Sequence, residues 1–201
     1  MNKFDVLIVD PPWRYNNKKT GGSHTSGSEQ KYKTMDYLQI AELKNEFYDL
    51  LADDSCLFFW VTNPMMKEAL YILDDWDYTY KTMITWDKIR YGMGFWFRSQ
   101  TEHCLFGVKG EVPAFRSNFP NIITEKRFTH SQKPDKFYYI INTLFAGKKI
   151  LELFATRTRY SNWTCIGNEI TGNDIVRDLE LLGQKMIEEK INAEKKIKPS
   201  Q

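Results

Sequence analysis

The chain has 201 residues, a length typical of one domain with a sizeable hydrophobic core, so a second folded domain is not expected. Its 28 Lys and Arg nearly balance its 26 Asp and Glu, and the net charge of +2 excludes a bulk electrostatic footprint for nucleic acid. Any site for a polyanion must therefore be a local patch.

An apolar run at residues 6–9 ends abruptly at Asp10-Pro11-Pro12-Trp13. We interpret the run as a buried parallel strand, because proline cannot extend a strand ladder. Ligand sites of α/β proteins lie at such strand ends. Residues 14–33 follow, rich in Gly, Ser, Asn and Lys, and predict a long mobile loop that is either a lid beside the strand end or a slack connector.

Predicted strands and helices then alternate along the chain. Helical spacing of apolar residues predicts helices over 36–51, 65–73, 134–145 and from 174 onward, the last weakened by Gly183. Apolar runs predict strands over 56–61, 78–86, 101–109, 149–154 and 164–167. This order predicts an α/β fold with a mostly parallel central sheet flanked by helices. We expect one domain over 1–192 and a charged, disordered tail over 193–201.

Several classes of protein are disfavoured by what the sequence lacks. The three cysteines are far apart and the three histidines show no ligand spacing with them, so neither a metal site nor a disulfide is expected. The chain has no Walker phosphate loop and no G-x-G-x-x-G run, which weakens the nucleotide-hydrolase and dehydrogenase alternatives. A signal-peptide layout and a membrane-length apolar run are also missing, so we expect a soluble, cytoplasmic protein without a membrane partner.

Four segments, taken in order, resemble the adenosine-N(6) methyltransferase family, which includes the catalytic subunit of the eukaryotic mRNA adenosine methylase and many bacterial and phage DNA adenine methylases. They are Asp10-Pro11-Pro12-Trp13, L-F-F-W-V-T at 57–62, E-H-C-L-F-G-V-K-G at 102–110, and H-S-Q-K-P-D at 130–135 followed by L-E-L-F at 151–154 and G-N-E at 167–169. The resemblance spans most of the chain and favours the bacterial and phage DNA members. It implies a Rossmann-like S-adenosylmethionine (SAM) methyltransferase of permuted order, with the catalytic motif before the cofactor-binding strand.

The resemblance makes Asp10, Pro11, Pro12 and Trp13 the catalytic residues. The 6-amino group of adenine is a poor nucleophile, because its lone pair is delocalised into the ring. The Asp10 carboxylate and the Pro11 carbonyl can accept its two hydrogens and aim the nitrogen at the methyl donor. Trp13 can stack on the flipped base. The alternative is a proline-terminated strand followed by a packed tryptophan.

The resemblance also implies a set of cofactor-binding residues. The lysine that matches Lys133 lies by the cofactor, where it can meet the methionine carboxylate, and Asn168 and Glu169 match positions that bind the cofactor ribose. The other predicted cofactor residues are Asp10, Glu152, Phe154, Arg157 and Thr158. Whether Arg157 or Arg159 meets the cofactor or a nucleic-acid phosphate stays open. Residues 173–175 are expected to complete the pocket for the cofactor's adenine.

Two loops with basic residues are the candidate nucleic-acid-binding surfaces, with ordinary solvated charge as the alternative for each residue. They carry Lys18, Lys19, Lys31 and Lys33 in the first loop and Lys88, Arg90 and Arg98 in the second. The resemblance implies SAM-dependent methylation of the adenine 6-amino group, and DNA is the expected substrate. RNA is the alternative substrate, and a catalytically inert nucleic-acid-binding subunit is the alternative function; a homodimer or a partner subunit stays open.

Overall fold

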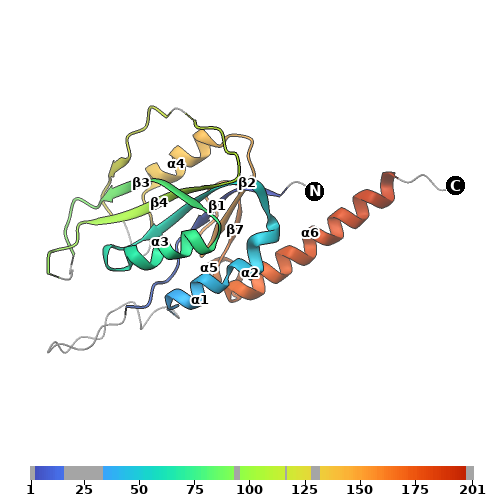
Figure 1. The fold of residues 1–201 in the computed structure, drawn as a ribbon, viewed down its shortest axis with the longest axis horizontal. Helices are drawn as coiled ribbons and strands as arrows, with labels where there is room; N and C mark the ends of the chain where they lie inside the picture. Colours follow the sequence, from blue (N-terminus) through green and yellow to red (C-terminus); the bar gives the residue numbers. More distant parts are fainter. Residues whose placement is uncertain (1–2, 16–33, 93–95, 116, 128–131, 198–201) are drawn as a thin grey trace.

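The structure is a computed structural model that describes residues 3–15, 34–92, 96–115, 117–127 and 132–197 (Figure 1). Its centre is a sheet of order β5-β3-β4-β2-β1-β6-β7. The strands are β1 (Phe4–Val9), β2 (Leu51–Val61), β3 (Thr79–Asp87), β4 (Thr101–Lys109), β5 (Ile122–Thr124), β6 (Ile150–Leu153) and β7 (Thr164–Ile166). Within the described residues, β4 runs antiparallel to its neighbours β2 and β3, and the other four pairings are parallel. The predicted α/β fold with a mostly parallel sheet is confirmed.

Both faces of the central strands are buried, which explains why their sequences are continuously apolar. In register, Leu7 of β1 lies between Leu57 of β2 and Leu151 of β6. Figure 1 shows α4 (Asp135–Leu144) on one side of the sheet, and on the other side α1 (Tyr37–Glu42), α2 (Lys44–Phe47), α3 (Met66–Asp75) and α6 (Ile175–Ile197). Two apolar clusters, one on each face, form the core. The remaining short helices are η1 (Tyr48–Leu50), η2 (Asn63–Met65) and α5 (Asn168–Thr171).

The predicted helix over 36–51 is wrong in its continuity. Asp36 caps the start of α1, forming a capping box with Gln39. The chain then tightens at Leu43, whose N–H bonds to the Ile40 carbonyl, and forms α2 and η1 as separate turns. Leu51 already belongs to the sheet, opposite Phe4, so strand pairing ends the helical segment five residues before the predicted strand at 56.

Two further differences concern the strand β5 and the end of helix α6. The short strand β5 was not predicted, because its three residues are too few to give a periodic signal. Helix α6 continues to Ile197, so residues 193–197 are helical where the sequence predicts a disordered tail; Ala193, Glu194 and the two lysines that follow are good helix formers. None of the helices that the structure describes is both long and apolar enough to cross a membrane.

The topology brings several loops to one edge of the sheet. The strands that run parallel to β1 end at this edge, and β4, which runs the opposite way, begins there. Asp10 follows β1, Thr62 follows β2, Lys88 follows β3 and Phe154 follows β6, while Glu102 lies at the start of β4. Carboxyl ends of parallel strands are where α/β folds bind ligands, so this edge is the place to look for a site.

Candidate active site

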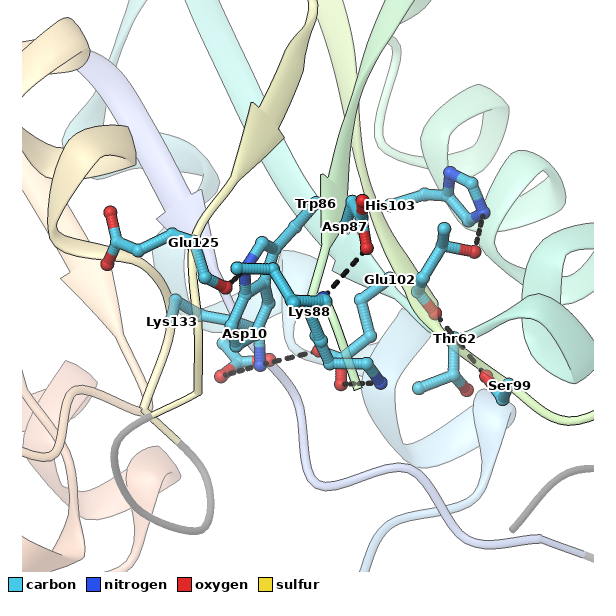
Figure 2. Close-up of polar contacts among 12 residues, drawn as sticks. Asp10, Thr62, Trp86, Asp87, Lys88, Ser99, Glu102, His103, Glu125 and Lys133 are labelled. Carbon is cyan, nitrogen blue, oxygen red and sulfur yellow. Dashed lines mark hydrogen bonds and ion pairs between the residues drawn. The ribbon is translucent and has the colours of Figure 1, made fainter. Parts of the chain in front are cut away.

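A chain of four alternating charges crosses this edge of the sheet (Figure 2). The ammonium Nζ of Lys133 lies 2.6 Å from Oδ2 of Asp10 and 3.4 Å from Oε2 of Glu102. The other oxygen of Glu102, Oε1, lies 3.1 Å from Nζ of Lys88. The Lys133 side chain is only 10% exposed, and it lies over the ring of Trp60, 5.3 Å from the centroid. Two carboxylates and two lysines therefore neutralise one another in a partly buried cluster.

Burial and the neighbouring charges together shift the pKa of Lys133, Asp10 and Glu102. Burial alone would lower the pKa of Lys133, but the adjacent carboxylates of Asp10 and Glu102 raise it overall, so the lysine is firmly protonated. Burial raises the pKa of Asp10, with Lys133 opposing the shift and the charge of Glu102 adding to it. Burial would also raise the pKa of Glu102, yet Lys133 and Lys88 together lower it. The pKa of Asp10 is therefore raised while the pKa of Glu102 is lowered, although both side chains contact the same ammonium.

The Asp10–Trp13 segment is held by its own hydrogen bonds. The Trp13 N–H donates to the Pro11 carbonyl at 2.9 Å, which leaves that oxygen one further lone pair. The Trp13 indole Nε1 donates to the Trp60 carbonyl at 3.1 Å, and its ring packs against Phe59 with centroids 5.6 Å apart. Because Trp13 is only 6% exposed, little of its ring is open to a base, and the predicted stacking role stays a prediction. These contacts show that Trp13 fixes the Asp10–Trp13 segment against β2.

A cavity of about 1050 Å³ joins the two halves of the predicted site. Its wall includes the Asp10–Trp13 segment together with predicted cofactor residues Lys133, Phe154, Asn168 and Glu169. Asp174 and Ile175, expected to complete an adenine pocket, also line it. The volume is at the upper end of the ~300–1,000 Å³ common for cofactor sites, so it can take a nucleoside cofactor and a base together.

The residues of the cavity fit SAM in chemical kind. Acidic and amide side chains at Asn168, Glu169 and Asp174 can bind ribose hydroxyls and amino groups, while Phe154 and Ile175 offer apolar surface for a purine. Three donors on Nζ allow Lys133 to keep both carboxylates and still reach a third acceptor. By contrast, the structure shows no cluster of three His, Cys, Asp or Glu side chains able to hold a metal ion, within the ranges that it describes.

Three predicted cofactor residues lie outside this cavity: Glu152, Arg157 and Thr158. Glu152 points to the α4 face, since Leu151 and Leu153 beside it in β6 face the other way. It is buried, accepting a hydrogen bond from the Tyr138 hydroxyl at 2.8 Å and one from the Cys165 thiol at 3.5 Å. Burial raises its pKa to about 7, despite these hydrogen bonds. No contact in the cavity supports a direct cofactor role for the three.

The two arginines left open by the sequence share one partner. Arg157 and Arg159 both pair with Asp135, in the first turn of α4. The Arg159 guanidinium also stacks 3.8 Å from the Tyr138 ring centroid and donates to the Lys133 carbonyl at 3.3 Å. With Thr158, they line a separate cavity of about 330 Å³. Arg159 therefore fixes the backbone that carries Lys133.

The predicted nucleic-acid-binding residues fall into three groups. Lys88 is one of the four alternating charges of the site. Its side chain is 13% exposed, and its ammonium is paired with Glu102. Arg90 and Arg98 are exposed on the loop between β3 and β4. Outside the described residues lie His130 of the fourth family segment and the first-loop lysines Lys18, Lys19, Lys31 and Lys33.

Sequence reasoning missed several residues that the fold brings to the site. Glu102 was recognised only as part of a motif, although an acid at the start of an apolar strand is a usable signal. Arg127 lines the cavity from the segment after β5. The Tyr15 and Thr62 hydroxyls lie 2.8 Å apart in the wall, and only the pairing of β1 with β2 brings them together.

Comparison with known proteins identifies relatives of this chain. The sequence model of the MT-A70 family matches residues 4–169, which confirms the family resemblance of the four segments. Over 190 residues the chain is 32% identical to the type II methyltransferase M.MunI of Mycoplasma sp., covering 86% of this chain and 80% of that protein. It is also 32% identical over 183 residues to the N(6)-adenosine-methyltransferase catalytic subunit METTL3 of Homo sapiens, covering 86% of this chain but 29% of METTL3.

Proposed function

Because the chain belongs to the MT-A70 family, we propose that it transfers a methyl group from SAM to the 6-amino nitrogen of adenine in DNA. The observation that carries the proposal is the single cavity of about 1050 Å³, whose wall holds both the Asp10–Trp13 segment and the residues suited to the cofactor. A donor and an acceptor of a methyl group must be held close together, and the proposal places both in this cavity.

Asp10 and the Pro11 carbonyl are the proposed acceptors for the two hydrogens of the amino group. Lys133 keeps Asp10 ionised against its burial, and Glu102 keeps Lys133 from pairing with Asp10 alone. The carboxylate is thereby held in place with an oxygen free to accept from the substrate. When bound, SAM supplies the activated methyl group, and Lys133, Asn168 and Glu169 are the residues proposed to hold it.

DNA is the proposed polymer, with RNA as the alternative. The relation to M.MunI covers 80% of that protein, whereas the chain matches only 29% of METTL3. Because this chain matches most of the length of M.MunI, we propose that the two proteins are similar in overall organisation. The similarity to METTL3 is what keeps RNA as the second candidate substrate.

Purified protein incubated with tritiated SAM and, separately, duplex DNA, single-stranded DNA and RNA tests both parts of the proposal. We expect label in DNA, recovered as N(6)-methyladenine after digestion to nucleosides. Label in RNA alone would show that the substrate is RNA in place of DNA, while the proposed reaction would stand. No transfer to any polymer, with no SAM binding by calorimetry, would support the inert-subunit alternative and overturn the enzyme proposal.

A further inference from the structure

The loop between β3 and β4 exposes large apolar side chains to solvent. Trp96 is 100% exposed and Phe97 is 85% exposed, and Ile89 and Tyr91 on the same loop are also exposed. All six tryptophans of the chain lie in the described residues, and the other five are buried. Aromatic rings in contact only with water are costly, and exposed groups of them mark interaction surfaces.

The same loop concentrates positive charge. Residues 88–100 contain one lysine, two arginines and no acid, a local charge of +3 in a chain whose net charge is +2. Arg90 and Arg98 are exposed on either side of the rings. Arginines interleaved with aromatic rings fit nucleic acid, because phosphates attract the cations and bases stack on the rings.

The base of the loop is fixed beside the site. The Lys88 ammonium is held by Glu102, and the Gln100 amide donates to the Asp87 carboxylate at 2.8 Å. The Lys88 N–H also donates to the Gln100 carbonyl at 3.0 Å, which closes the loop. Figure 1 shows the described parts of the loop, residues 88–92 and 96–100, extending past the edge of the sheet at which β1 and β3 end. The loop that carries the rings thus begins at Lys88, which is paired with a carboxylate of the site.

We propose that Trp96 and Phe97 stack on nucleobases next to the target adenine, while Arg90 and Arg98 contact the flanking phosphates. This inference rests on the proposed function. An adenine that leaves the base stack to reach Asp10 exposes the faces of its neighbours, and flat rings beside the site can cover them. A symmetric contact between two copies of the chain would set this positive loop against itself, so nucleic acid is the better partner.

Tryptophan fluorescence gives a direct readout, since Trp96 is the one exposed tryptophan of the six. Titration with an adenine-containing single-stranded oligodeoxynucleotide should quench this emission and protect it from acrylamide. Trp96→Phe should lose the signal but keep the affinity, because a ring remains for stacking. An unquenched Trp96 in a protein that demonstrably binds the oligonucleotide would overturn the inference.

Affinity measurements separate the rings from the arginines. Trp96→Ala should weaken binding about tenfold at every salt concentration, without changing the slope of log affinity against log salt. Arg98→Ala should instead reduce that slope by about one. Tyr71→Ala, which removes an exposed ring from α3, is the matched control and should match the wild type. SAM affinity, measured by calorimetry, should be unchanged in all three variants.

The outcomes distinguish this inference from the proposed function. A wild type that methylates DNA while Trp96→Ala binds and methylates equally well overturns only the inference. A change from dimer to monomer in Trp96→Ala, seen by analytical ultracentrifugation with unchanged nucleic-acid affinity, would assign the loop to a protein contact and overturn it too. A wild type that binds no nucleic acid would overturn the proposed function together with the inference.

Discussion

Lys133 is the residue on which the electrostatics of the site depend. Its ammonium is shared between Asp10 at 2.6 Å and Glu102 at 3.4 Å, and Lys88 compensates Glu102 from the other side. Since the shared charges are nearly buried, a change at one group alters the proton affinity of the others. The ionisation of Asp10 therefore depends on Glu102, a residue that lies 92 positions away in the sequence.

Replacing Glu102 by Gln should move the acid limb of the kcat/KM profile for methyl transfer to lower pH. The raised pKa of Asp10 means that activity is lost as the pH falls through it, and the charge of Glu102 contributes to the rise. Without that charge, Asp10 stays ionised to lower pH. Glu180→Gln, an exposed acid on α6, is the control and should leave the profile unchanged. An acid limb that stays in place or moves to higher pH in Glu102→Gln would contradict the account.

Glu152 should make the protein less stable as the pH rises from about 4.5 to about 7. Burial raises its pKa from the usual 4.5 of a glutamate to about 7, so the unfolded chain releases this proton before the folded chain does. The loss is on the order of 3 kcal/mol and is complete above the folded pKa. Denaturant unfolding at pH 5 and pH 8 should show a smaller fall in the free energy of unfolding for Glu152→Gln than for the wild type. An identical pH dependence in the variant and the wild type would refute it.

The sequence predicts which residues belong to the site better than it predicts which residues they contact. Asp10 and Lys133 could be singled out because each sits in a short motif. Their direct ion pair could not, since 123 positions separate them and only the fold sets the distance. Glu152 shows the opposite error: its motif suggests the cofactor, but strand alternation turns its side chain toward Tyr138.

Among the elements, the close approach of the segments after β6 and β7 shapes the part of the cavity that is proposed to bind the cofactor. Ala155 donates its N–H to the Ile166 carbonyl at 2.9 Å, and both Ala155 and Asn168 line the cavity. A Cβ on Gly167 would lie 2.5 Å from the Ala155 carbonyl oxygen and 2.8 Å from its nitrogen. Only a residue without a side chain allows this contact.

Gly167→Ala should therefore destabilise the fold by roughly 1–3 kcal/mol and weaken SAM binding, because the two backbones must separate. Gly183→Ala is the matched control. That residue lies within α6, and its Cβ would meet only Leu50 at an ordinary 3.8 Å. Alanine there should stabilise by roughly 0.5–1 kcal/mol through helix propensity, with SAM affinity unchanged. Denaturant unfolding and calorimetry check both, and equal effects of the two substitutions would argue against the packing explanation.

Long segments with many apolar residues can be predicted as strands or helices from the sequence, whereas elements of only a few residues cannot. The two central strands β1 and β2 and helix α4 carry enough apolar residues to reveal themselves. The three-residue β5 and the end of the helical segment before Leu51 depend on contacts with distant residues, as β5 pairs with β3 and Leu51 pairs with Phe4. Tertiary pairing there overrides local preference.

For the whole molecule, the topology explains why motifs spread over the chain act together. The motif at Asp10 precedes the cofactor strands β6 and β7 in sequence, yet β1 and β6 are neighbours in the sheet. The segments after them therefore open into one cavity. We propose that Asp10 holds the amino group that accepts the methyl while Asn168 holds the cofactor, within this shared space.

A crossed comparison of two variants tests that claim most directly, with N(6)-methyladenine measured by mass spectrometry and SAM affinity by calorimetry. Asp10→Ala should abolish transfer, a loss of at least about a hundredfold, while SAM affinity stays within about tenfold. Lys133 keeps Glu102 in this variant, so the fold should persist. Asn168→Ala should weaken SAM binding and recover transfer at saturating SAM. Near wild-type production of N(6)-methyladenine by Asp10→Ala would contradict the account.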